Sequence, residues 1–132
     1  DGSPTLYMEK FDEYYHSKHG AVQEAEHVYL KMGLDFWKNQ YPNVKKCRVF
    51  EMGFGTGLNA LLTAQKATQL QLEVNYHTIE AYPLTPLELK EVNYNDYLEA
   101  TAKVLFDQII EAPWETSHAV TAHFCLKKMK IL

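Results

Sequence analysis

The stretch VFEMGFGTGLN, from Val49 to Asn59, decides the fold of this chain. An apolar run ends at an acid, glycines then recur at every second position, and a stretch with strong helix propensity follows. A strand that enters a glycine-rich turn at a helix N-terminus is how α/β folds bring backbone N–H groups close to a small ligand. The stretch therefore predicts an α/β domain with a ligand site at this turn.

The segments on either side alternate between strand-like and helix-like patterns. Strands are predicted at 47–52, 73–80 and 119–132, and helices at 58–67, from about 87 onward and around 104–110. This order is the βαβαβ half of a doubly wound parallel sheet. The last predicted strand would normally be central in such a sheet, and no covering helix follows it. We therefore expect one apparently incomplete domain over residues 1–132.

The first 45 residues are predicted to form an extension made of a hairpin and a helix. Short strands are expected at 6–8 and 14–15. From Ala21 onward apolar residues recur at spacings of three and four, which predicts one buried helix face formed by Val22, Ala25, Val28, Tyr29 and Met32. Gly33 interrupts this pattern, but residues 34–37 suggest a second helical turn or a short following helix, which residues 41–43 end. Residues 1–45 are thus assigned to the extension, and 46–132 to the βαβαβ portion that would bind a cofactor.

Composition places the chain among ordinary globular proteins. Of its 132 residues, 46% are hydrophobic and 23% are charged. The net charge of −4 excludes a chain that is basic throughout, as many nucleic-acid binders are. No run of about 18 apolar residues is present, so we expect no membrane association. The two cysteines and six histidines show no metal-like spacing, so no metal site is predicted and a cytoplasmic protein with reduced thiols is expected.

The glycine spacing indicates which ligand the turn would hold. Gly53, Gly55 and Gly57 are evenly spaced, and Leu58 stands where a dinucleotide-binding turn has its third glycine. Glu51 precedes the glycines, and this arrangement resembles the cofactor-binding turn of class I S-adenosylmethionine methyltransferases. Glycine N–H groups could approach the methionine moiety, and the carboxylate could accept a hydrogen bond from its ammonium group. A glycine-rich turn that binds nothing is the alternative.

A second acid supports a cofactor site. Glu80 closes the second predicted strand, where a carboxylate can accept hydrogen bonds from both ribose hydroxyls. Tyr82 follows closely and could stack on an adenine ring. The alternative for Glu80 is a surface acid at the end of a strand.

The turn also resembles one particular family. Residues 51–59 are similar to the Gly-Phe-Gly-Thr-Gly-Leu-Asn segment of the tRNA wobble-uridine methyltransferases, which are the methyltransferase part of bifunctional MnmC and its stand-alone counterpart MnmD. Residues 15–30 and 79–84 are similar to other segments of this family. The resemblance implies a Rossmann-like class I methyltransferase fold and S-adenosylmethionine as cofactor. It also implies methylation of the aminomethyl group of a modified wobble uridine in tRNA, forming 5-methylaminomethyl-2-thiouridine.

The resemblance assigns roles residue by residue. On the methionine side of the cofactor it places Glu51, Gly53, Gly55, Gly57 and Asn59. It places Glu80 at the ribose and Tyr82 near the adenine. Tyr15, Ser17 and Glu24 are candidates for a lid over the cofactor, and the alternative for them is a hairpin and helix packed on the sheet edge.

The family's Asp-x-Phe-Ala-Pro-like segment, where the acceptor amine is expected, does not occur in residues 1–132. We therefore predict no catalytic residue here, and expect a truncated or cleaved chain that is inactive alone and binds cofactor weakly or not at all.

Two other functions stay open at this point. One is a non-catalytic nucleotide- or cofactor-binding module, and the other is a class I methyltransferase for a small molecule or a protein. The partner implied by the resemblance is tRNA, and an exposed sheet edge could also lead to self-association.

Overall fold

The computed structural model describes residues 20, 22–91 and 98–131, and these residues contain one four-stranded sheet. The strands are β1 (Lys46–Met52), β2 (Glu73–Glu80), β3 (Ser117–Thr121) and β4 (Phe124–Lys130), in the order β1-β2-β4-β3. β1, β2 and β4 are parallel, and β3 pairs antiparallel with β4. The predicted α/β class and the strands at 47–52 and 73–80 are confirmed. The assignment of residues 1–45 and 46–132 to two portions stays a prediction.

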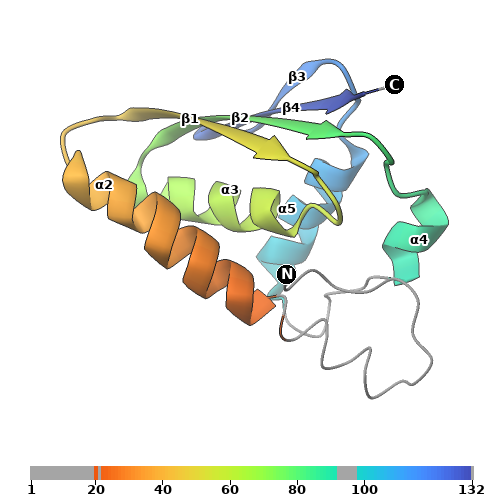
Figure 1. Ribbon diagram of the computed structural model, residues 1–132, viewed down its shortest axis with the longest axis horizontal. Helices are drawn as coiled ribbons and strands as arrows, with labels where there is room; N and C mark the ends of the chain where they lie inside the picture. The colour runs from red at the N-terminus through yellow and green to blue at the C-terminus, as the bar shows by residue number, and fades with distance from the viewer. Residues whose placement is uncertain (1–19, 21, 92–97, 132) are drawn as a thin grey trace.

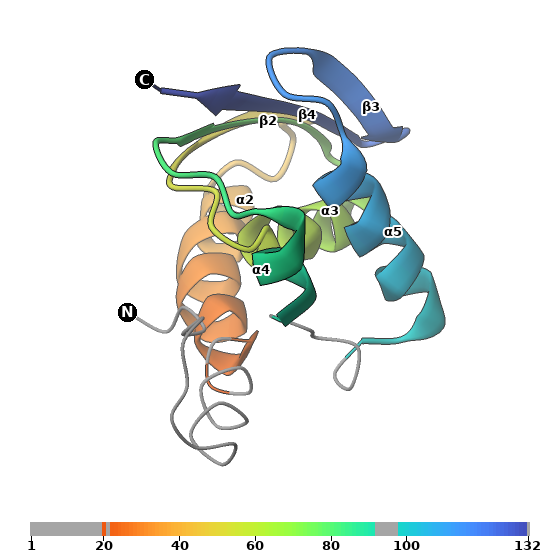
Figure 2. The same cartoon turned by 90° about the vertical axis from the view of Figure 1, so that its right-hand side faces the viewer.

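The helices lie on one face of this sheet (Figures 1 and 2). They are η1 (Ala25–Asp35), α2 (Phe36–Gln40), α3 (Leu58–Leu70), α4 (Pro86–Glu91) and α5 (Ala100–Glu111). α4 lies beyond the carboxyl ends of β1 and β2 and begins at Pro86, as the sequence predicted. It is preceded by a capping box, because the Glu88 N–H donates to Thr85 Oγ1 and the Thr85 N–H donates to Glu88 Oε1.

The prediction of one strand over 119–132 is wrong, because two strands occupy this region. A two-residue turn separates β3 from β4, and the Thr121 hydroxyl accepts a hydrogen bond from the His123 N–H within it. The turn carries none of the glycine, asparagine or proline signals that mark a hairpin in sequence. β4 lies between β2 and β3, so the last strand has partners on both sides. Among the described strands, β1 and β3 form the edges, and the site-bearing β1 has one open edge.

The predicted buried face of the N-terminal helix is also partly wrong. Residues 25–35 are wound as a π-helix, whose hydrogen bonds run from residue i to i+5, so each turn holds more residues than an α-helical turn. Leu30 and Leu34 are therefore buried, whereas Val28 and Met32 are 55% and 66% exposed. The helix continues through Gly33 into α2 and ends before residues 41–43, as the sequence predicted. The predicted hairpin before it lies outside the described residues.

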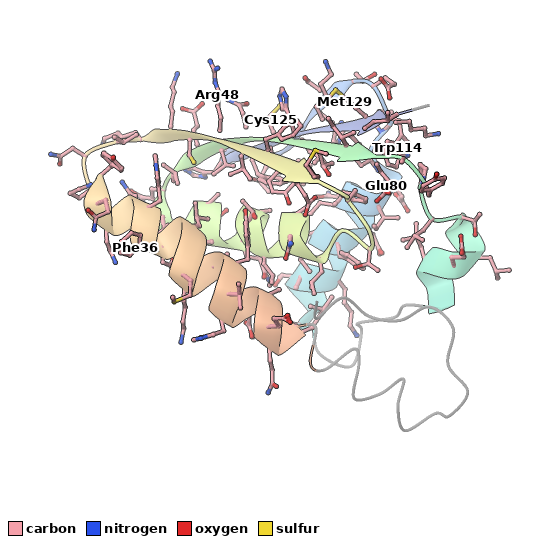
Figure 3. All side chains as sticks on the ribbon, viewed as in Figure 1. Phe36, Arg48, Glu80, Trp114, Cys125 and Met129 are labelled. Atoms are coloured by element: carbon pink, nitrogen blue, oxygen red, sulfur yellow. The ribbon has the colours of Figure 1, made fainter. Side chains whose placement is uncertain are left out.

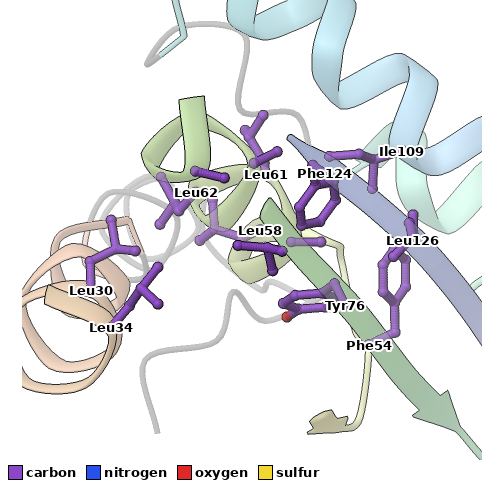
Figure 4. Close-up of a cluster of buried hydrophobic side chains, with 14 of the residues drawn as sticks. Leu30, Leu34, Phe54, Leu58, Leu61, Leu62, Tyr76, Ile109, Phe124 and Leu126 are labelled. Atoms are coloured by element: carbon purple, nitrogen blue, oxygen red, sulfur yellow. The ribbon is translucent and has the colours of Figure 1, made fainter. Parts of the chain in front are cut away.

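One core joins the sheet to the helices (Figure 4). Among the described elements, α3 contributes the largest number of buried residues, and its Leu61 has no exposed surface. Val74, Tyr76 and Thr78 alternate along β2 and point into the same layer. α5 adds Ile109, which is also fully buried. Apolar burial between α3, α5 and the sheet thus holds the turn between β1 and α3 in place.

The opposite face of the sheet has no helix on it among the described residues. Arg48, Cys125 and Met129 project from this face in Figure 3. Phe50 and Met52 on β1 are 58% and 74% exposed. Parallel sheets usually have both faces covered, so this open face departs from the usual arrangement. Within the described residues, no helix is long and apolar enough to cross a membrane.

Replacing Leu61 with alanine tests whether α3 anchors the fold. Leu61 is fully buried, so the substitution should lower the free energy of unfolding by about 2–5 kcal/mol, measured by urea denaturation. The control is Leu87→Ala at a side chain that is 68% exposed, where a change within about 0.5 kcal/mol is expected. Equal losses in both variants would contradict this account of the core.

Candidate functional site

The turn between β1 and α3 has backbone angles that favour glycine. The φ angles are +94° at Gly53, +57° at Gly55 and +85° at Gly57, a region that other residues rarely occupy. The Gly53 N–H donates to the Ile79 carbonyl at 2.7 Å, which fixes the start of the turn to β2. The Gly57 N–H donates to the Phe54 carbonyl at 3.0 Å, and Gly57 is also the residue at which α3 is capped. The glycines are therefore needed for a defined backbone geometry and not for flexibility.

Glu80 lies against this turn rather than on open surface. Its Oε1 accepts a hydrogen bond from the Gly55 N–H at 2.8 Å, and its Oε2 accepts one from the Tyr82 N–H at 3.2 Å. The parallel pairing of β1 and β2 brings their carboxyl ends together, which explains this contact between residues 25 positions apart. The structure thus brings Glu80 and the glycine turn together, as the sequence predicted for a shared site.

Glu51 lies inside the structure beneath the same turn. Its Oε1 accepts a hydrogen bond from Thr78 Oγ1 at 2.8 Å. The hydroxyl of Tyr76 is buried beside this carboxylate and has no hydrogen bond of good geometry among the described residues. Burial raises the pKa of Glu51, whereas Thr78, Tyr76 and Asn59 oppose the rise and the charge of Glu80 adds to it. Part of the carboxyl's ordinary acidity is therefore lost to desolvation.

A second set of hydroxyl groups lies next to Glu51. Thr63 Oγ1 is 2.7 Å from Tyr29 Oη and donates to the Asn59 carbonyl at 2.7 Å. Burial raises the pKa of Tyr29 to about 12, and the nearby charge of Glu51 contributes to the rise. Tyr29 thus stays protonated at neutral pH.

The two acids have no cationic partner in the described part of the chain. No lysine, arginine or histidine there forms an ion pair with Glu51 or Glu80, whereas Lys66 and Asp35 form one at 3.4 Å away from the site. A Cβ added at Gly53 or Gly55 would meet no atom within 4 Å, so space is open beside both. The N–H groups of the three glycines are engaged within the protein, so the free groups of the site are the remaining oxygen lone pairs of two carboxylates that lack a cation. Such acceptors suit a ligand that carries both a cation and hydroxyl groups. The described residues contain no cluster suited to a metal ion.

The other residues predicted for the site make fewer contacts with the glycine turn. The Tyr82 ring is 85% exposed and contacts the site through its backbone N–H. Asn59 lies in the first turn of α3 and is half-buried. Glu24 precedes η1 and has no hydrogen bond to the glycine turn among the described residues. Tyr15 and Ser17 lie outside the described residues, so the predicted lid stays a prediction.

Tyr76 and Thr78 belong to the site but were not among the residues predicted for it. Tyr76 lies four residues and Thr78 two residues before Glu80, so all three side chains point to the same face of β2. A strand that alternates inward as Val74, Tyr76, Thr78 and Glu80 carries polar groups toward its carboxyl end, and this pattern could have revealed them. Lys128 was also missed, because a lysine in a strand is normally expected to be exposed.

Comparisons with known proteins return one kind of relative. The chain is 36% identical over 108 residues to the "tRNA 5-methylaminomethyl-2-thiouridine biosynthesis bifunctional protein MnmC" of Campylobacter fetus, a match that covers 80% of this chain and 16% of that protein. It is 32% identical over 119 residues to the MnmC of an Acidovorax species, covering 86% of this chain and 17% of the relative. The chain thus spans about one sixth of the length of these relatives. No protein-family model matches it.

The backbone is similar to that of a solved structure. The crystal structure of MNMC2 from Aquifex aeolicus matches with a TM-score of 0.50 and 19% identity, over 84% of this chain and 33% of that one. At this identity the likeness concerns the fold alone. Together with the parallel strand order, it confirms the predicted Rossmann-like α/β fold.

Alanine substitutions in the turn should separate backbone strain from packing. A Cβ at Gly57 would lie 2.9 Å from Phe54 Cζ and 3.1 Å from Ile110 Cδ1, whereas a Cβ at Gly53 would meet nothing within 4 Å. Both positions have positive φ, so each variant should lose about 1–3 kcal/mol of unfolding free energy, with Gly57→Ala losing more. Gly33→Ala, in a helix, should lose nothing. Urea denaturation measures the loss of unfolding free energy. A smaller loss in Gly57→Ala than in Gly53→Ala would contradict the close packing of Phe54 and Ile110 against Gly57.

Replacing Glu51 with glutamine should change the pH dependence of stability. The pKa of Glu51 in the folded state lies above the ordinary glutamate value of 4.5, so folding favours the protonated acid. Wild-type stability should therefore fall, relative to Glu51→Gln, as the pH rises from 4.5 through the raised folded value. Chemical denaturation across this range measures the difference, and Glu111→Gln at an exposed position is the control. A difference that does not depend on pH would show that Glu51 is not desolvated.

Proposed function

This chain belongs to the family of the MnmC proteins, and on that premise we propose that it forms the cofactor-binding part of an S-adenosylmethionine-dependent tRNA methyltransferase. The observation that carries the proposal is the contact between the Gly55 N–H and the Glu80 carboxylate, at the carboxyl ends of two adjacent parallel strands. Ligands of open α/β sheets bind in this region. Two acids, three glycines of positive φ and free space above the turn lie there together.

The groups present fit the proposed cofactor. S-adenosylmethionine carries a sulfonium and an ammonium group. These positive charges would compensate the negative charges of the two carboxylates, which have no cationic partner in the described residues. Glu80 keeps acceptor capacity beyond its two backbone hydrogen bonds and could hold the ribose hydroxyls. Glu51 and Asn59 would face the methionine moiety, and the absence of side chains at Gly53 and Gly55 would let it approach the backbone. When bound, the cofactor would supply the electrophilic methyl group.

The residues of this chain would act by binding and orientation. An amine acceptor must be neutral and in line with the transferred methyl group, so holding the cofactor in one position contributes much of the rate. Glu80 would fix the ribose, and the rigid turn would fix the methionine end. The proton lost by the amine would pass to groups that we do not assign to residues 1–132. We therefore propose a binding role, and no catalytic residue, for this chain.

The proposed acceptor is the aminomethyl group of a modified wobble uridine in tRNA, with 5-methylaminomethyl-2-thiouridine as product. The names of the relatives support tRNA over a small molecule or a protein as substrate. We also propose that the protein acts in the cytoplasm. Self-association through the open edge of β1 stays a prediction.

Calorimetry with S-adenosylmethionine tests the proposed site directly. We expect measurable but weak binding to the chain, and a loss of about 10–100-fold in affinity in Glu80→Gln, because hydrogen bonds to a charged group contribute about 1.5–3 kcal/mol. Glutamine can still accept the Gly55 hydrogen bond, so the fold should persist. Glu111→Gln serves as the matched control. Absence of heat at high protein concentration, or equal affinity in Glu80→Gln, would overturn the proposal for the site.

Methyl transfer tests the substrate. The product of the complete reading frame should transfer labelled methyl groups from S-adenosylmethionine to tRNA that bears the unmethylated aminomethyl group, and not to tRNA that lacks it. Binding of the cofactor without any transfer to such tRNA would favour a non-catalytic module.

A further inference from the structure

Lys128 is a buried lysine with an unusual set of partners. It lies on the helix-facing side of β4, and only 1% of its surface is exposed. Its Nζ donates hydrogen bonds to the carbonyls of Ile109 at 3.0 Å and Ile110 at 2.9 Å, near the C-terminus of α5. No carboxylate forms an ion pair with it in the described part of the chain. The ammonium is thus held by carbonyls at the negative end of a helix.

Two aromatic rings complete the surroundings of this ammonium. Lys128 Nζ lies 5.3 Å from the centre of the Phe54 ring and 5.0 Å from the centre of the Trp114 ring. The two rings meet edge to face, with centroids 5.9 Å apart and an interplanar angle of 77°. Both distances are within the range of a cation–π interaction, which is stronger when the cation is desolvated. The ammonium group of Lys128 therefore contacts α5, Trp114 and Phe54 at the same time.

Phe54 transmits this connection to the glycine turn. It stands between Gly53 and Gly55 and is 6% exposed, so its ring points into the core while the flanking glycines lie at the surface. Its carbonyl accepts the Gly57 N–H, and its Cζ lies where a Cβ on Gly57 would be 2.9 Å away. A shift of the Phe54 ring would therefore move the backbone whose Gly55 N–H meets Glu80.

We propose that Lys128 is a positioning residue for the glycine turn: its ammonium holds the Phe54 ring against Trp114 and so fixes the backbone of the turn, including the Gly55 N–H that holds Glu80 in place for the ligand. The part of this inference that concerns a ligand rests on the proposed function. The contact between Lys128, Phe54 and Trp114 does not.

The charge on Lys128 should be lost in an accessible pH range. Burial, together with a smaller contribution from the charge of Lys130, lowers its pKa to about 8. Lys130 Nζ is itself 5.3 Å from the Trp114 ring centre, and the Glu115 carboxylate accepts a hydrogen bond from the Lys130 N–H. α5 presents backbone carbonyls to Lys128, and the glycine turn presents the Phe54 ring. Above this pH the amine is neutral, and both the cation–π contacts and the charge-assisted hydrogen bonds are lost.

Trp114 fluorescence tests the inference without any ligand. In a Trp37→Phe background, the Trp114 signal should change with a midpoint near pH 8. The transition should disappear in Lys128→Met and persist in Lys127→Met, at the neighbouring residue on the opposite face of β4. In Lys130→Met it should move to higher pH, because the charge that lowers the pKa is removed. An unchanged midpoint in Lys128→Met would overturn the inference.

Lys128→Arg keeps the test decisive if the methionine variant fails to fold. Arginine stays charged throughout this range, so a folded Lys128→Arg protein should show no transition near pH 8. A retained transition would assign it to another group and refute the role of Lys128.

Cofactor affinity separates this inference from the proposed function. Between pH 7 and pH 9 the wild-type affinity for S-adenosylmethionine should fall several-fold, whereas that of Lys128→Arg should stay constant. If no variant binds while the Trp114 transition follows Lys128, the proposed function fails and the positioning contact stands. If Lys128→Met binds as tightly as wild type at every pH, the positioning role fails and the proposed function stands.

Discussion

The hydrogen bond from the Gly55 N–H to the Glu80 carboxylate is the contact on which the site depends. It exists because β1 and β2 are parallel neighbours and because three glycines take positive φ angles between β1 and α3. Any side chain at Gly57 would collide with Phe54, so the close return of the chain requires glycine there. The core under α3 and α5 then holds this geometry at the sheet's carboxyl edge.

Charge is distributed unequally around the turn. Glu80 lies beside the turn and Glu51 beneath it, both without a cationic partner in the described residues. Glu51 is desolvated enough for its pKa to rise. Lys128 lies on the inner side, where carbonyls and aromatic rings hold its charge. Desolvated acids cost folding free energy, and such groups commonly occur where a ligand supplies the missing charge. This arrangement gives a physical reason for a cationic ligand.

Most of the fold could be predicted from local patterns, and the failures have definite causes. β2 was predicted with its observed bounds because Val74, Tyr76 and Thr78 alternate with exposed residues. The hairpin of β3 and β4 was missed because its turn lacks the usual turn residues. The buried face of the N-terminal helix was misjudged because π-winding changes the spacing of neighbours, and sequence periodicity assumes an α-helix.

The sequence by itself determined the α/β order, the glycine turn and the two acids of the site, because these follow from spacing along the chain. The tertiary structure alone decided which groups meet. Thr78 and Tyr76 reach Glu51 through strand pairing, and Lys128 reaches Phe54 across more than 70 positions because β4 lies beside β2. The structure also decided that β1 is an edge strand and β4 an inner one. Strand order depends on long-range pairing, which no local pattern in residues 49–59 encodes.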